Sequence, residues 1–267
     1  MQFKKIKTLL VVFVLVASGF GSIVYANHSW GGYHWARTSN PFTLELGDNV
    51  ASSWDGYLAT TASDWSISSV LDTVIKPGNT RARTCKATNG RVEVCSEKYG
   101  STGWLGVAQI WVSGSHITKG TVRVNDSYFR TSTYNTSAWK NLVMCQEVGH
   151  TLGLDHQDED FGNSNLNTCM DYTSDPSSNQ HPNQHDYDML ESIYEHTDSF
   201  STLISAVSGN TGSKRGRSER VLAQNIDIED WLVQERNGRE PREAKRSVYI
   251  DDIGNDERVF TFVTWVQ

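Results

Sequence analysis

The residues that could do chemistry gather in one short run of the 267-residue chain, QEVGHTLGLDH over residues 146–156. Gln146 and His150 are four residues apart, so on a helix they would share one face, with Glu147 beside them. A turn at Gly153 would return His156 to the same point. One amide oxygen and two imidazole nitrogens would then meet beside a carboxylate.

This set of donors predicts a metal site. Zinc binds imidazole nitrogen in tetrahedral sites, and a catalytic zinc keeps its fourth position for a water whose pKa it lowers to about 7. Glu147 would take the proton of that water. Gln146 is the weakest donor, because a neutral amide oxygen suits Mg²⁺ or Ca²⁺ better than Zn²⁺, so we expect a lower affinity for zinc.

The run resembles the metzincin signature His-Glu-x-x-His-x-x-Gly-x-x-His, with Gln146 in place of the first histidine. A second metzincin hallmark, the methionine turn beneath the metal, is similar to NTCMDY over 167–172. The resemblance implies that Gln146, His150 and His156 bind zinc and that Met170 supports the site. It also implies that Tyr172 can assist the oxyanion, as a tyrosine does in astacins and serralysins; a packing role for Tyr172 stays open.

The resemblance covers residues 30–197 and is closest to the matrixins. HDYDMLESIY over 185–194 looks like their closing helix, and WLGVA over 104–108 looks like their substrate-lining edge strand. A peptide would then lie antiparallel to this strand. Matrixins commonly bind calcium, and the acidic residues after the run leave calcium open as a second ion. The strand residues expected to bind substrate are Leu105, Gly106, Val107 and Ala108.

Local patterns predict the elements that must position these residues. Apolar spacing over 52–66 predicts a helix capped by Ser52 or Ser53, and a second helix follows the cap residues 135–137 and ends at Gly153. We expect strands near 33–37, 70–75, 104–112 and 121–124. These elements predict an α+β fold. The resemblance makes this expectation more specific. It implies a metzincin-like catalytic domain with a mixed twisted sheet, two long helices, a methionine turn, a C-terminal helix and a small β-rich tail.

The four cysteines allow three pairings. Cys85 and Cys95 flank an Asn-Gly turn signal, which favours a disulfide across a β-hairpin. Cys145 would lie about 140° around the helix from His150, away from the metal pocket, which favours its bridge to Cys169. In a reducing compartment the same cysteines would be buried thiols.

The first 26 residues have the pattern of a secretion signal. Three lysines precede the apolar segment 9–17, and Val24 and Ala26 supply the small residues of a cleavage site. The pattern predicts Asn27 as the mature N-terminus of a secreted, extracellular protein without a membrane span. A retained anchor is the alternative, although no polar stop-transfer pattern follows.

Charge and composition divide the rest of the chain. A net charge of -7 argues against binding of nucleic acid through its phosphates. After the signal peptide 1–26, we expect a metalloprotease domain over 27–200, a charged linker or appendage over 201–246, and a β-hairpin tail over 247–267. The second strand of that hairpin has apolar groups on both faces, so the catalytic domain or a partner must cover it.

These observations predict a secreted zinc-dependent endopeptidase that cleaves protein or peptide substrates, with Glu147 as general base. A pseudoprotease that keeps the fold and serves as a peptide- or surface-binding module is the competing hypothesis, and Gln146 supports it. A structural secreted domain with an incidental motif is the third class, and metal content alone would identify it.

Overall fold

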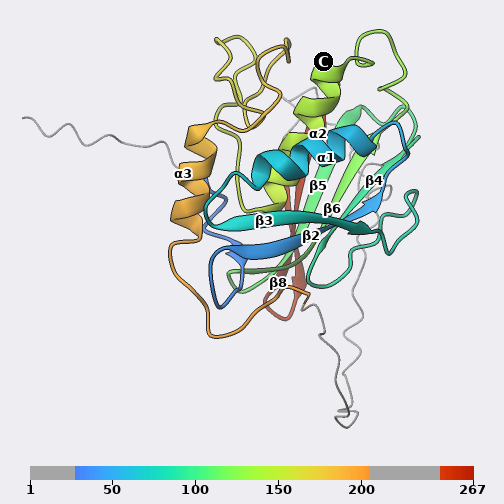
Figure 1. Cartoon of the computed structure of the whole chain (residues 1–267). Coiled ribbons are helices and arrows are strands. Elements are labelled where there is room, and N and C mark those ends of the chain that lie inside the picture. The colour runs from blue at the N-terminus through green and yellow to red at the C-terminus, as the bar shows by residue number, and fades with distance from the viewer. Residues whose placement is uncertain (1–27, 205–246) are drawn as a thin grey trace, which may run out of the picture.

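The computed structural model describes residues 28–204 and 247–267, which form an α+β fold with one mixed eight-stranded sheet and three helices (Figure 1). The strands run in the order β3-β2-β4-β6-β5-β8-β7, and β1 pairs with β6 outside this path. Their bounds are β1 (His34–Trp35), β2 (Phe42–Asn49), β3 (Leu71–Pro77), β4 (Val92–Glu97), β5 (Trp104–Ser113), β6 (His116–Asn125), β7 (Val248–Gly254) and β8 (Glu257–Trp265).

The sheet has a parallel half and an antiparallel half. Strands β3, β2, β4 and β6 pair in parallel, and β5, β8 and β7 follow in antiparallel pairing. Helix α1 (Asp55–Trp65) contacts β3, helix α2 (Ser137–Thr151) contacts β5 and β6, and the two helices contact each other. Helix α3 (Gln184–Ile193) lies to one side of them (Figure 1). Because helices cover the middle strands, β5 is buried almost throughout.

The second predicted helix has the expected ends. The Thr136 side chain accepts a hydrogen bond from the backbone N–H of Trp139, as an N-cap does. The helix ends before Gly153, whose φ of 98° is in the left-handed region. The cap predicted for the first helix is wrong. Helix α1 starts after Trp54, which makes no side-chain cap bond, and the buried Trp54 indole donates to Asp126 Oδ1 at 2.8 Å instead.

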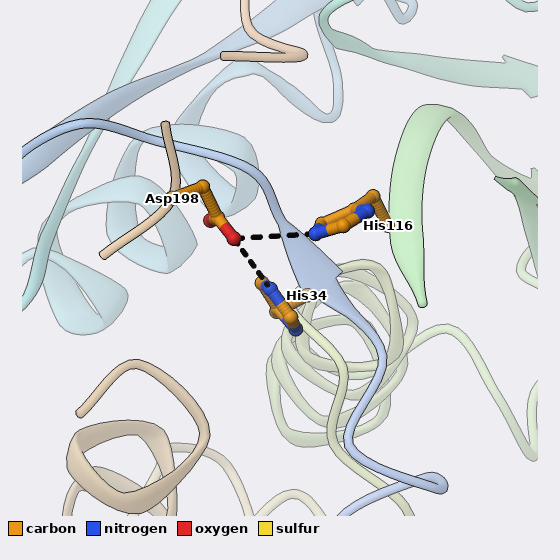
Figure 2. A group of neighbouring side chains, drawn as sticks. All are labelled: His34, His116 and Asp198. Carbon is orange, nitrogen blue, oxygen red and sulfur yellow. Dashed lines mark hydrogen bonds and ion pairs between the residues drawn. The ribbon is translucent and has the colours of Figure 1, made fainter. Parts of the chain in front are cut away.

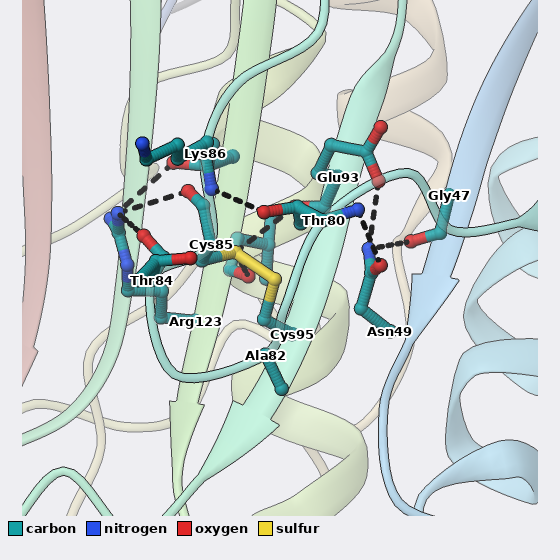
Figure 3. The surroundings of a disulfide bond; sticks show 12 residues. Gly47, Asn49, Thr80, Ala82, Thr84, Cys85, Lys86, Glu93, Cys95 and Arg123 are labelled. Atoms are coloured by element: carbon teal, nitrogen blue, oxygen red, sulfur yellow. Dashed lines mark hydrogen bonds between the residues drawn. A yellow bond between two sulfur atoms is a disulfide. The ribbon is translucent and has the colours of Figure 1, made fainter. Parts of the chain in front are cut away.

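Both predicted disulfides are present, Cys85–Cys95 and Cys145–Cys169. The hairpin expected around the first one is absent. Cys95 lies on β4, but Cys85 lies in an irregular loop, where Arg123 Nη2 donates to its carbonyl oxygen at 3.1 Å (Figure 3). The disulfide therefore fastens a loop onto β4. The other disulfide joins α2 to the segment that carries Met170.

The predicted tail hairpin is present as β7 and β8, but it is continuous with the main sheet. Strand β8 pairs with β5 along nearly its whole length, and the backbone N–H of Gln267 donates to the Tyr134 hydroxyl at 3.0 Å. The chain therefore ends near the start of α2 (Figure 1). Within the described residues, no helix has the length and apolar character that crossing a bilayer requires. The predicted leader, Asn27 and residues 205–246 of the linker predicted over 201–246 lie outside the described residues.

Candidate metal and active site

Helix α2 buries the predicted site residues at its C-terminal end. Gln146, Glu147 and His150 are each at most 1 % exposed. The turn at Gly153 brings His156 back against His150, with a ring-centroid distance of 4.5 Å. The structure therefore brings the two predicted imidazole ligands together, and it buries the predicted general base on the helix that carries His150.

The two imidazoles face each other through their Nε2 atoms, 3.0 Å apart. His150 Nδ1 lies 2.9 Å from the carbonyl oxygen of Leu154, which can only accept, so Nδ1 carries the proton. His156 Nδ1 faces Glu159 Oε1 at 3.2 Å and is protonated for the same reason. In the neutral rings both Nε2 atoms then present lone pairs to each other, an arrangement that requires a cation.

A metal ion fits this requirement better than a proton does. Burial, with a further contribution from His156, lowers the pKa of His150 well below its ordinary value, so the protonated form is disfavoured. Glu159 and Leu154 orient the two rings in the manner of the outer-shell partners of zinc-bound histidines. The donors present therefore fit a zinc ion on the Nε2 side.

Glu147 lies between α2 and β5 with no exposure to solvent. Burial raises the pKa of its carboxyl group to about 8, although polar groups of Thr264 and Ala108 oppose the shift. Neither carboxylate oxygen has a hydrogen-bond partner of good geometry. Gly106 makes this position possible, because a Cβ there would lie 2.4 Å from Glu147 Oε1. A buried carboxyl group with a pKa near neutrality can both accept and return a proton.

Gln146 makes its contact with the C-terminal strand. Its Oε1 accepts a hydrogen bond of 2.6 Å from the Thr264 hydroxyl, and its Nε2 has no partner among the described residues. An amide oxygen has two lone pairs, so one remains for a metal ion. The position predicted to be the weakest ligand is therefore in direct contact with β8.

The segment with Met170 packs directly beneath α2. A Cβ added to Gly149 would lie 2.5 Å from the Met170 sulfur, so the helix and the methionine are in close contact. The Thr168 hydroxyl accepts from the backbone N–H of Met170 at 3.0 Å and donates to Asp186, which belongs to the capping box of α3. This network connects α3 to the segment that packs on α2 at Gly149.

Tyr172 packs on the ligand pair. Its ring centroid lies 4.3 Å from that of His156, and the ring of Phe161 stacks on the Tyr172 ring at 4.8 Å. Burial raises the pKa of the Tyr172 phenol above its ordinary value, so the hydroxyl remains protonated and available as a donor. The packing role is evident in these contacts, and the hydroxyl stays near enough to the site for a catalytic role to be tested.

The predicted substrate strand is already paired on both sides. Strand β6 covers one edge of β5, and β8 covers the other with Gly106 opposite Thr264 and Ala108 opposite Phe262. The Phe262 ring stacks on the His150 ring at 4.4 Å with an angle of 8° between the planes. Neither Thr264 nor Phe262 was predicted as a site residue. The only signal for them in the sequence was the apolar pattern on both faces of the last strand.

No family model and no curated protein sequence matches this chain.

Proposed function

We propose that this protein is a secreted zinc-dependent metalloendopeptidase of the metzincin type. One observation carries the proposal: the Nε2 atoms of His150 and His156 face each other at 3.0 Å, and the buried Glu147 lies on the same helix about one turn before His150. The two disulfides are compatible with an extracellular location. The methionine-turn and closing-helix assignments extend the same proposal.

Gln146, His150 and His156 would hold the ion. When bound there, zinc would lower the pKa of a nearby water and polarise the scissile carbonyl group. Glu147 accepts the proton from the water and returns it to the leaving amine, a task that suits a carboxyl group whose pKa is about 8. Leu154 and Glu159 hold the imidazoles in orientation, and the Tyr172 hydroxyl, whose ring packs on His156, would donate to the oxyanion.

In this proposal the described conformation is a latent one. Strand β8 pairs antiparallel with β5, which is how a peptide substrate would lie there. Its Phe262 covers His150, and its Thr264 engages Gln146. Peptide cleavage therefore requires β8 to leave, after which a substrate pairs with β5 in its place.

A second function, a peptide- or surface-binding pseudoprotease, is favoured by one observation. The Thr264 hydroxyl bonds the amide oxygen that zinc would need, in a site closed to solvent. A protein of this kind would keep the fold and bind little zinc at the His150–His156 pair. Metal content and hydrolysis separate the two functions.

The test measures zinc and proteolysis on the same preparations. Replacement of His150 and His156 by alanine should remove one equivalent of zinc per chain, whereas Glu147→Gln should retain that zinc and abolish cleavage of an unfolded protein substrate. Glu195→Gln, an exposed glutamate on the surface, is the matched control and should change neither quantity. Because the wild type is expected to be latent, each substitution is also assayed together with Phe262→Ala. Undiminished cleavage by the Glu147→Gln protein would refute the assignment.

A further inference from the structure

Three histidines and one aspartate converge at a second place in the fold, where β1 pairs with β6. His34 lies on β1, His116 is its register partner at the start of β6, and His196 and Asp198 follow α3. Figure 2 shows His34 and His116 pointing at the same oxygen of Asp198. The ligand atoms of His34, His116 and Asp198 lie within 4.8 Å of one another. None of the four residues belongs to the sequence motif of the first site.

Four of the separations between the donor atoms lie near the spacing that one small cation requires. A tetrahedral zinc ion with bonds of about 2.0 Å requires donor atoms about 3.3 Å apart. His196 approaches both His34 and Asp198. Because its side chain is 57 % exposed, it can adjust to occupy the fourth position of a tetrahedral site. The measured separations are 3.2 Å for His116 Nε2–Asp198 Oδ1, 3.2 Å for His196 Nε2–His34 Nε2, 3.6 Å for His34 Nε2–Asp198 Oδ1 and 3.8 Å for His196 Nε2–Asp198 Oδ1.

Outer contacts hold two of the donors in a ligating orientation. His34 Nδ1 lies 2.8 Å from the carbonyl oxygen of Gly32, so Nδ1 carries the proton and Nε2 presents a lone pair. Asp198 Oδ2 accepts from the backbone N–H and Nη1 of Arg37, both at 3.1 Å, which leaves Oδ1 to face the imidazoles. Arg37 also donates to the carbonyl oxygen of His196. Partners of this kind are typical of metal-binding histidines and carboxylates.

We propose that His34, His116, His196 and Asp198 form a second, structural zinc site. Three imidazole nitrogens and one carboxylate oxygen are donors that zinc accepts, and a set of four protein ligands leaves no open position for catalysis. The ion would join β1 and the segment after α3 to β6. Residues 34 and 198 are far apart in the chain, so the ion would close a long loop.

The proposed zinc site lies next to the end of α2, the helix that carries the first site. The indole of Trp35, beside His34, donates to the carbonyl oxygen of Thr151 at 2.9 Å, and the Tyr194 hydroxyl donates to that of Leu152 at 2.9 Å. The second zinc would therefore stabilise the C-terminal end of α2, from which the chain turns toward His156. The inference does not depend on the proposed peptidase activity.

The experiment compares zinc content and thermal stability in the full chain. The protein is stripped with a chelator, reloaded with zinc and analysed for metal, alongside His116→Ala/His196→Ala and His196→Ala. We expect the double variant to hold one zinc per chain fewer than the wild type, whatever the first site holds. The single variant should bind that zinc at least 10-fold more weakly. Because His196 is exposed, its replacement should leave the fold intact.

His181→Ala is the matched control. His181 has a similarly exposed side chain and an ion pair with Asp64, but it is outside the cluster, so its replacement should leave zinc content unchanged. Zinc should also raise the melting temperature of the wild type more than that of either cluster variant. Equal zinc content and equal affinity in the wild type and both cluster variants would overturn the proposal. Loss of zinc in the His181→Ala control would do the same.

Discussion

Replacement of Phe262 by alanine should release the latent site. The Phe262 side chain is completely buried, stacks on His150 at a centroid distance of 4.4 Å and meets the edge of Trp30 at 5.7 Å. Truncation of a buried phenylalanine costs about 3–5 kcal/mol. If β8 can leave while the rest of the fold persists, this cost falls on the docked state alone.

The expected change in activity follows from that cost. Since each 1.4 kcal/mol changes an equilibrium about tenfold, a loss of about 3 kcal/mol raises the population of the released state by roughly 100-fold. The hydrolysis rate of a quenched fluorescent unfolded protein, measured with saturating zinc, should rise by about this factor until the released state dominates. Thermal unfolding of the same samples reports how much stability the substitution removes.

Ile250→Ala provides the control on the same hairpin. Ile250 lies on β7 and is 54 % exposed, so its truncation removes little packing and should leave the hydrolysis rate nearly unchanged. A Phe262→Ala protein that loses stability, keeps zinc and hydrolyses no faster than the Ile250→Ala protein would refute the reasoning. In that case β8 would be a permanent strand of the sheet.

Three further predictions test the surroundings of the site. Gly106→Ala should abolish hydrolysis in the released protein while zinc stays bound, because its Cβ would lie 2.4 Å from Glu147 Oε1. The control is Gly56→Ala, in open space on α1, which should leave activity unchanged and add about 0.5–1 kcal/mol of stability. In the metal-free protein, folding keeps a proton on Glu147 that the unfolded chain releases, so the free energy of unfolding should fall as the pH rises from 4.5 to about 8. Urea unfolding at several pH values should show that Glu147→Gln removes this part of the pH dependence. Replacement of both Cys85 and Cys95 by alanine should lower the free energy of unfolding by about 2–3 kcal/mol in urea titrations, since the bridge closes a loop with a sequence separation of 10; an unchanged midpoint would contradict this.

The sequence predicted those features that depend on neighbouring residues. The spacing of four between Gln146 and His150, the cap at Thr136 and the turn at Gly153 are local, and the structure contains the expected helix and its return to His156. The hairpin of the last residues and both disulfides were also predicted. Local patterns failed at Ser52 and Ser53, because burial of Trp54 fixed the start of α1.

The sequence by itself determined which residues are gathered beside Glu147, since they lie within one helix and one turn. Only the tertiary structure decided what covers them. The apolar groups on both faces of β8 required a cover, but a strand's own pattern does not name its partner, and the pairing with β5 spans more than a hundred residues. The same holds for His34, His116, His196 and Asp198. They have no shared motif, and they meet because β1 pairs with β6 and the chain after α3 returns to Arg37.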